Sequence, residues 1–356
     1  MDVSGLFQIQ RVGFRHGTDD ELAALHAIES RVEAERRPDL TPKPLDSYRA
    51  FARTISPQFD DHAWLAIAPD ATPAASAFCW SNDAGDPTVM ECDIMVRNEY
   101  RRLGIGTRLI AAICDETAAN NRVLLTWSTC DAAPSGESFS RWLSADVGRV
   151  NRTSELTLDT VDWRMISRWT DAKEARLHGY SIDFVEGAIS ADMLDDAVRF
   201  HHIMQTAPQD DIAFGDATLD AQNIDALDQS LIASGRDQWT VFVRDTHREC
   251  IGGTQVTFEP WEPDAALQQN TGIESVHRGC GLAKWAKAAM LERLREFRPE
   301  IARIRTGNAY SNAPMLAIND RIGFREIGAR TEWQANVGAL QHQLRSLAKN
   351  SSSDKL

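Results

Sequence analysis

Two short glycine turns decide the fold of this chain: RRLGIG at Arg101–Gly106 and RGCGLA at Arg278–Ala283. Their first arginines, at positions 101 and 278, stand 177 residues apart. Each turn follows a short apolar segment of strand-like composition, 89–96 in the first copy and 267–273 in the second. Each turn also opens a segment in which apolar residues recur at helical steps. Two strand–turn–helix units at one spacing predict two similar domains.

The pattern around the two turns repeats as well. In the first half a helical segment at 19–36 precedes strand segments at 63–68 and 74–80. In the second half helical segments at 193–204 and 223–234 precede strand segments at 239–244 and 250–258. The expected fold class is therefore α+β, an α/β sandwich in which each half is a mixed, mostly antiparallel sheet flanked by helices.

These repeats define the expected domains. The N-terminal domain is predicted at 6–160 and the C-terminal domain at 181–335. The segment 161–180 is a candidate linker, because it is charged and carries only amphipathic helical periodicity. Residues 336–356 are predicted to be a tail, since the end from Asn350 is polar and low in complexity.

Length and charge exclude several classes of protein. The chain has 356 residues and 43% apolar content, which is enough to bury a core in each of two domains. Its 38 basic and 52 acidic residues give a net charge of −14, which argues against nucleic acid as a partner. No apolar run is long enough to span a bilayer, and the first residues lack the order of a signal peptide. These features predict a cytoplasmic protein without a membrane partner.

The metal-ligating residue types show no pattern typical of a metal site. The six cysteines are scattered without a CxxC pair, so neither a zinc knuckle nor a disulfide framework is expected. The nine histidines include no HExxH pair. No metal is predicted.

The repeated turn has the chemistry of an anion site. A turn that opens a helix leaves backbone N–H groups without partners, and the helix dipole favours negative charge there. Gly104 and Gly281 lack the Cβ atom that would block a close approach, and Gly106 and Ala283 are also small. The arginines are expected to add positive charge. Each half is therefore predicted to hold a phosphate group.

Two competing phosphate sites fail on context. A Rossmann site needs three glycines in GxGxxG near the start of a βαβ unit, whereas these turns come late in each half. A nucleoside triphosphate loop needs a lysine followed by Ser or Thr, which both turns lack.

The motifs together resemble the GCN5-related N-acetyltransferase (GNAT) superfamily. The family holds the pyrophosphate of acetyl-CoA in a loop of the form Arg/Gln-x-x-Gly-x-Gly/Ala after its fourth strand. The second copy also contains HRGCGL at 277–282, TGNAYSNAPM at 306–315 and INDRIGF at 318–324. These segments are similar to motifs of tandem acetyltransferases that are common in actinobacteria. The resemblance implies two tandem GNAT-like domains and acetyl-CoA as cosubstrate. The residues it implies for cofactor binding are Val96, Arg101, Arg102, Gly104, Ile105 and Gly106 in the first copy, and Ile273, Arg278, Gly279, Cys280, Gly281, Leu282, Ala283 and Asn312 in the second.

The resemblance also implies a direct attack by an amine on the thioester, which needs a base, an oxyanion donor and an acid. The donor would be a backbone N–H on the fourth strand, near Met95 or Gly272. The first copy offers Asp93 or Glu91 as the base.

The second copy is less complete in acid–base groups. Gln268, Gln269 and Asn270 do not titrate, so its nearest carboxylate is Glu274. Its candidate acid is Tyr310, because Asn319 stands where many family members have a tyrosine.

The resemblance and these residues together predict the function: transfer of acetyl from acetyl-CoA to a primary amine of a small molecule, which is a metabolite or antibiotic-like. The C-terminal half is favoured as the catalyst because its cofactor motif is fuller. Two alternatives stay open: an acyl-CoA-binding sensor or scaffold without turnover, and the same fold transferring a different acyl group. The sequence does not predict the oligomeric state.

Overall fold

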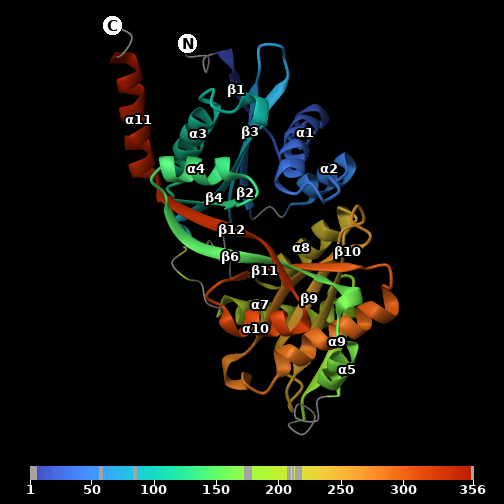
Figure 1. Cartoon of the computed structure of the whole chain (residues 1–356). Helices are drawn as coiled ribbons and strands as arrows, with labels where there is room; N and C mark the ends of the chain where they lie inside the picture. The colour runs from blue at the N-terminus through green and yellow to red at the C-terminus, as the bar shows by residue number, and fades with distance from the viewer. Residues whose placement is uncertain are drawn as a thin grey trace. The chain divides into compact units, whose positions relative to one another are not determined.

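A computed structural model describes residues 6–55, 59–82, 86–171, 179–206, 210, 212 and 219–353. The chain divides into two compact units. Unit 1 comprises Met1–Val150, Asp210–Ala217 and Arg330–Leu356, and unit 2 comprises Asn151–Gln209 and Thr218–Ala329. Figure 1 labels the elements of both units, which are described separately below.

The two units contain similar elements in a similar order. Unit 1 contains β1 (Gln8–Val12), α1 (Asp19–Arg36), α2 (Leu45–Thr54), β2 (Phe59–Ile67), β3 (Pro73–Asn82), β4 (Val89–Val96), the short 3-10 helix η2 (Asn98–Tyr100), α3 (Ile105–Ala119), β5 (Leu124–Cys130), α4 (Pro134–Trp142) and α11 (Val337–Ser353). Unit 2 contains η3 (Leu158–Thr160), α5 (Trp163–Thr170), β7 (Ser181–Glu186), η4 (Ala191–Met193), α7 (Leu194–Gln205), α8 (Ala221–Ala233), β8 (Asp237–Arg244), β9 (Cys250–Phe258), β10 (Ala265–Ile273), η5 (Ser275–His277), α9 (Leu282–Phe297), β11 (Arg303–Ala309) and α10 (Ala313–Ile322). The strands β6 (Asp146–Thr157) and β12 (Arg325–Asn336) each contribute residues to both units.

Local signals explain the helices that the sequence predicts. Thr18 and Glu21 form a capping box that starts α1, so the first N–H groups of the helix are satisfied. The buried stripe of α1 consists of Leu22, Leu25, Ile28 and Val32, which recur at helical steps. The helices predicted from both glycine turns are confirmed as α3 and α9.

Each unit is built on a mixed sheet. In unit 1 the strand order is β1-β2-β3-β4-β5-β12, and only the β4–β5 pair is parallel. In unit 2 the order is β7-β8-β9-β10-β11-β6, and only the β10–β11 pair is parallel. The predicted α+β class with mostly antiparallel sheets is confirmed.

The last strand of each sheet comes from a distant part of the sequence. Residues 330–336 of β12 pair with the whole of β5, so the end of the chain completes unit 1. Residues 151–157 of β6, which directly follow the N-terminal half, pair with β11 and complete unit 2. The chain therefore changes unit at 150/151, 209/210, 217/218 and 329/330, which differs from the expected domains at 6–160 and 181–335. The physical reason is strand exchange, because the strand that follows α4 joins the sheet of unit 2.

Two segments expected to lie outside the domains are packed helices instead. In the expected linker at 161–180, α5 buries Met165, Ile166 and Trp169 in the core of unit 2, while 172–178 lie outside the described residues. In the expected tail at 336–356, α11 buries Val337 and Leu340 in the core of unit 1. Both segments have helical periodicity, and an apolar helix face is stable only when it is buried.

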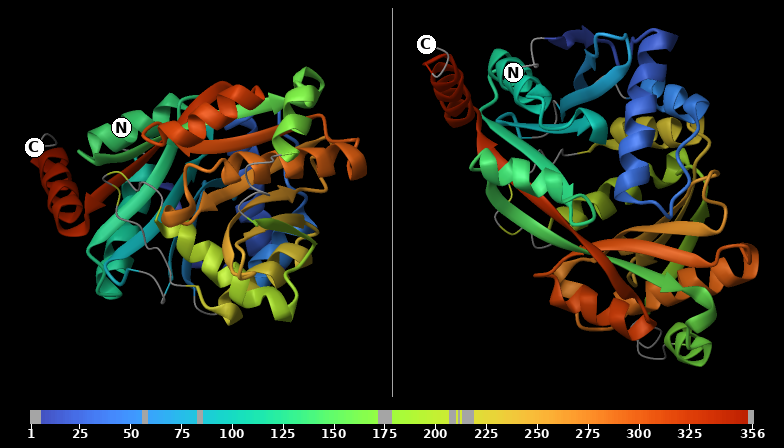
Figure 2. Two further views of the ribbon diagram at one scale, coloured as in Figure 1. Left: turned by 90° about the horizontal axis from the view of Figure 1, so that it is seen from below. Right: turned by 45° about the horizontal axis from the view of Figure 1, so that its top comes forward.

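Helices cover both faces of the unit 1 sheet. A cluster on one face joins α1 and α2 to the sheet through Leu22, Ile28 and Ala52. The cluster on the other face joins α3 to the end of α4 through Ile105, Leu109 and Leu143, the residue that follows α4. Figure 2 shows this arrangement, with the blue helices α1 and α2 on one side of the strands and the green helix α4 on the other. Within the described residues, no helix has the length and apolar character to span a membrane.

Candidate functional site

The two glycine turns have the same backbone conformation. Gly104 and Gly281 are the N-caps of α3 and α9, and both lie in the left-handed region, at φ 77° and 82°. Two residues earlier, Arg102 (φ 63°) and Gly279 (φ 84°) also lie in this region. Glycine adopts this conformation without strain, whereas Arg102 does not, so unit 2 forms the turn with less backbone strain.

Each turn presents a row of free backbone donors. Within the described residues, the N–H groups of residues 102–107 and of 279–284 have no hydrogen-bond partner. These groups surround the start of a helix, where the dipole favours an anion. A Cβ at Gly279 would meet nothing within 4 Å, and one at Gly281 would meet only the end of the Lys284 side chain, at 3.6 Å. The turns therefore fit a diphosphate, and we call the donor rows 102–107 and 279–284 the cradles.

The first arginine of each turn points back to its own strand. Nε of Arg101 donates to the carbonyl of Val96 at 3.0 Å, and Nε of Arg278 donates to the carbonyl of Ile273 at 2.8 Å. Arg101 also binds Glu35 through both Nη atoms, each at 2.6 Å. These arginines therefore position the cradles, a role that differs from the charge contribution expected from the sequence.

Next to each cradle the central strands separate. β4 pairs with β5 only over Val89–Glu91, and β10 pairs with β11 only over Ala265–Leu267. The rest of β4 and β10 faces an opening in the sheet, which leaves backbone N–H groups along that edge available to a ligand. Met95 and Gly272, near which the sequence predicts an oxyanion donor, both lie in these stretches. In unit 2 a register shift between Gln268 and Thr271 adds an irregularity to the strand.

A partly buried carboxyl group lies at the opening of unit 1. Asp93 follows the last β4–β5 pair, and its Oδ1 lies 3.7 Å from Nη2 of Arg36 on α1. Burial raises the pKa of Asp93, the Arg36 guanidinium opposes this shift, and the carboxylate of Glu33 adds to it. A carboxyl group with a raised pKa, close to an opening in the sheet, is suited to accept a proton from a substrate.

A second acidic group lies on the same helix. Burial also raises the pKa of Glu29, although Lys43 opposes the shift from 3.6 Å away. Glu33 and Asp93 both raise the pKa of Glu29 further, so the three carboxylates sense one another. Unit 1 therefore has a partly buried acidic cluster of Glu29, Glu33 and Asp93, compensated by Arg36 and Lys43.

The corresponding strand in unit 2 carries neutral side chains that are hydrogen-bonded within the sheet. The amide of Gln268 donates to Oγ1 of Thr254 at 3.0 Å and to the carbonyl of Gln255 at 2.7 Å. The amide of Gln269 donates to Oγ1 of Thr257 at 3.0 Å. These contacts stabilise β9 and β10 but provide no group that titrates near neutral pH.

The candidate residues of unit 2 lie in separate local contacts. Glu274 forms an ion pair with Arg199 of α7 at 3.4 Å, and the hydroxyl of Tyr310 donates to Glu326 at 2.6 Å. Tyr310 is also 44% exposed. Asn312 caps α10, where its side chain accepts from the N–H of Met315 at 3.4 Å. The structure therefore does not bring Glu274 and Tyr310 together.

Asn319 stands where many family members have a tyrosine, and Ser140 lies at the corresponding place in α4. Both side chains are buried and polar. Ser140 of α4 accepts from Nε1 of Trp127 at 2.8 Å. Asn319 of α10 donates to Oδ1 of Asn308 at 2.7 Å. Both side chains therefore link a helix to the strand on the far side of the opening. The sequence identifies Asn319 as a departure from the family, but it gives no signal for this contact.

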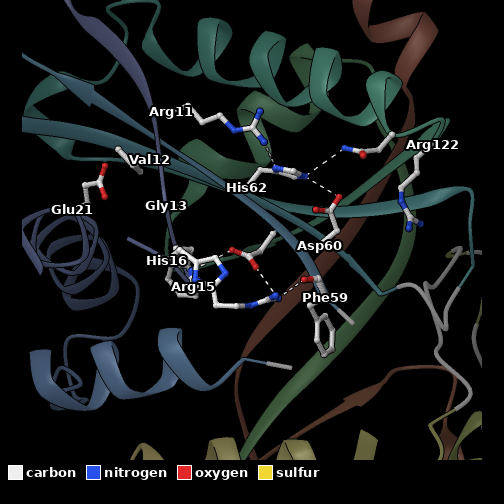
Figure 3. A pocket seen from close by; sticks show the side chains of 13 residues that line it. Arg11, Val12, Gly13, Arg15, His16, Glu21, Phe59, Asp60, His62 and Arg122 are labelled. Atoms are coloured by element: carbon white, nitrogen blue, oxygen red, sulfur yellow. Dashed lines mark hydrogen bonds and ion pairs between the residues drawn. The ribbon is translucent and has the colours of Figure 1, made fainter. Parts of the chain in front are cut away.

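A polar cavity of about 810 Å³ lies elsewhere in unit 1 (Figure 3). It is lined by Glu21 near the start of α1, whereas Glu35 near the end of that helix binds Arg101 of the cradle. At about 1.5 Å per residue the helix separates the two sites by roughly 20 Å. In the cavity, Nε2 of His62 lies 2.9 Å from Asp60, and Arg15 lies 3.0 Å from Asp61. His62 and Arg15 thus each have an acidic partner within the cavity.

Comparison with known proteins agrees with this geometry. Residues 25–134 match the Acetyltransferase (GNAT) family. A tandem GNAT protein from the clavulanic acid biosynthesis pathway is similar in structure, with a TM-score of 0.73 and 20% identity over 93% of this chain and 99% of the other. A GCN5-related N-acetyltransferase from Sphaerobacter thermophilus has a TM-score of 0.62 and 12% identity over 92% and 96% of the two chains. No curated protein matches the sequence.

Residues 25–134 thus match the GNAT family model, and the fold of the described residues is similar to that of solved GNAT and tandem GNAT proteins. The matched stretch runs from α1 to the start of α4 and includes the cradle and Asp93 of unit 1. The family supports acyl transfer as the general activity, and its members generally use acetyl-CoA.

Proposed function

We propose that the protein transfers acetyl from acetyl-CoA to a primary amine of a small molecule. The observation that carries this proposal is the repeated pairing of a cradle with an opening in the sheet. A diphosphate at residues 102–107 or 279–284 would direct the attached chain toward the unpaired edge of β4 or β10. There the backbone N–H groups could polarise a thioester carbonyl.

We place the chemistry in unit 1. Asp93 is a partly buried carboxyl group at the opening, and the family match falls within this unit. The sequence favours the C-terminal half because of its fuller cofactor motif, but the strand at its opening carries Gln268, Gln269 and Asn270. The side chains at the two openings thus favour unit 1 for proton transfer. The less strained backbone of the glycine turn in unit 2 favours cofactor binding there.

In this mechanism each residue of unit 1 has one task. Asp93 accepts the proton of the attacking amine, and the charge of Arg36 favours the ionised form of Asp93 that can do so. The acidic groups of Glu29 and Glu33 favour an acceptor that carries positive charge. Acetyl-CoA supplies the activated acyl group when it is bound.

A second candidate function applies to unit 2. Its cradle is complete, but its opening has a neutral, internally hydrogen-bonded lining, which favours acyl-CoA binding without transfer to a free amine. A different acyl group in either unit is the remaining alternative.

The test is release of the CoA thiol from acetyl-CoA in the presence of a panel of cationic amines. Gly104→Glu places a carboxylate in the cradle of unit 1, and Gly281→Glu does the same in unit 2. Gly104→Ala and Gly281→Ala are the matched controls, since they add the same backbone strain without charge. We expect turnover to be lost in G104E and retained in G281E. Turnover lost only in G281E would place the reaction in unit 2, and binding without turnover for every amine would favour the sensor.

A further inference from the structure

Unit 2 contains a buried lysine on the helix that starts at its cradle. Lys287 of α9 is 2% exposed, and its Nζ lies 5.6 Å from the centre of the Phe324 ring. Within the described residues it forms no ion pair. Burying an ammonium group without a counter-charge is costly, so this side chain is under pressure to be neutral.

The equivalent position of unit 1 shows that the fold does not require a lysine here. Counting 177 residues back from Lys287 gives Ile110 of α3, which is 1% exposed and belongs to the apolar core. The core thus accepts an aliphatic side chain at this place in the helix. The amine in unit 2 is therefore not explained by packing.

The rise of α9 puts Lys287 level with the opening between β10 and β11. α9 follows β10 and leads to the parallel strand β11, so it runs back over the sheet from the cradle. From Leu282 to Lys287 the helix advances about 7.5 Å, which corresponds to two or three strand residues. This places Lys287 near the level of Asn270, beyond the end of the β10–β11 pairing.

A second polar group at this level lacks a partner. Asn319 of α10 is 2% exposed, and its Oδ1 is buried without a hydrogen bond. Its Nδ2 donates to Asn308 of β11, and its backbone carbonyl accepts from the N–H of Phe324 at 3.0 Å. Phe324 therefore contacts both Asn319 and Lys287. A buried acceptor without a donor indicates a place where a further N–H group can bind.

We propose that Lys287 is an acetylation site, modified by acetyl-CoA bound in the cradle of unit 2. This inference rests on the proposed binding of acetyl-CoA, but not on transfer to a free amine. The neutral Nζ attacks the carbonyl carbon of the thioester, so that a C–N bond forms and the C–S bond breaks. CoA departs as a thiol with the proton released by the nitrogen. The product is an Nε-acetyl-lysine whose amide N–H can donate to Oδ1 of Asn319.

The protonation state of the lysine supports this step. Burial alone lowers the pKa of Lys287 to about 7, with no other charged group contributing to the shift. The nucleophilic neutral amine is then present in a large fraction at physiological pH, without a separate base. This agrees with the neutral lining of unit 2, which supplies none.

The experiment is incubation of the full chain with acetyl-CoA, followed by peptide mass spectrometry. We expect one acetyl group on Lys287, at a rate that rises with pH through about 7 as the amine loses its proton. Lys284, on the same helix and partly exposed, reports non-specific acetylation. Equal modification of both lysines, or an unmodified Lys287 in protein shown by calorimetry to bind acetyl-CoA in unit 2, would overturn the inference.

Gly281→Glu provides the decisive variant, because it disrupts the cradle and leaves Lys287 in place. We expect G281E to lose the modification of Lys287 while its reaction with a small acetylating reagent, acetic anhydride, is unchanged. Modification that persists in G281E would contradict the role of the cradle. If calorimetry instead detects no acetyl-CoA binding in either unit, the proposed function itself fails.

Discussion

Asp93 on β4 and Arg36 in the last turn of α1 face each other across 3.7 Å, and this pair joins the central strand of unit 1 to its first helix. The two shifts have opposite effects on charge: burial raises the pKa of Asp93, whereas the nearby carboxylates of Asp93 and Glu33 help to raise the pKa of Arg36. The arginine therefore stays charged, and its charge opposes the rise in the pKa of Asp93. This pair is the origin of two predictions.

Asp93→Asn should remove the proton acceptor with little change in shape. We expect kcat to fall by about 10² to 10⁴-fold, the usual contribution of a general base. Acetyl-CoA binding, measured by calorimetry, should be unchanged. Glu91→Gln is the control on the same strand, since Glu91 lies within the β4–β5 pairing and should retain most of the activity. A larger loss in E91Q than in D93N would identify Glu91 as the base.

Arg36→Met should shift the pH dependence of the reaction. The guanidinium lowers the pKa of Asp93, so removing it raises that pKa further. The base is active only when ionised, and the acidic limb of kcat/KM against pH should therefore move to higher pH. Arg36→Lys keeps the charge and should shift the limb less. An unchanged profile in R36M would show that Asp93 does not limit the rate.

Arg278→Lys should weaken acetyl-CoA binding in unit 2 even though it keeps the charge. The Nε of Arg278 holds the carbonyl of Ile273, and a lysine cannot reproduce this contact together with the one to Thr206. Losing a charge-assisted hydrogen bond of about 1.5 kcal/mol corresponds to roughly tenfold in affinity. Calorimetry measures this change. If R278K binds acetyl-CoA as tightly as the unchanged protein, the cradle needs the charge at this position and not the contact with Ile273.

Residues 1–150 alone should fail to fold, because the edge of β5 would lose residues 330–336 of β12. A single chain that joins 1–150 to 330–356 through a flexible linker should recover a cooperative unfolding transition, measured by circular dichroism. The two chains differ only in the linker, the exchanged strand and α11. Equal unfolding behaviour of both chains would show that the exchanged strand does not stabilise unit 1.

The sequence predicts the parts of the fold that depend on neighbouring residues. The turns at Gly104 and Gly281, the helices after them and the capped helix α1 follow from glycine positions, caps and apolar steps. Strand exchange is not predictable in this way, because the pairing of β12 with β5 joins segments about two hundred residues apart. The local sequence of a strand does not encode its partner.

In the candidate site, too, the sequence predicts the residue types but not the contacts between distant parts of the chain. The residue types at Asp93 and in the two cradles are evident in the sequence, but the partners of Asp93 come from α1, far away in the chain. The hydrogen bond from Arg101 to the carbonyl of Val96 depends on the direction of the arginine side chain, and the sequence motif does not specify that direction. The sequence gives no signal for Lys287, because the positions of the apolar residues of α9 do not show that this amine is buried.

The exchange of strands also determines the order in which the two units can complete their sheets during translation. Residues 151–329 leave the ribosome before 330–336, so the sheet of unit 2 can be completed while unit 1 still lacks its edge strand. The half that is translated first is therefore the half that matures last. Until then, the bare edge of β5 is exposed to pairing with other chains, and a chaperone that shields this edge during translation would protect the nascent protein from aggregation.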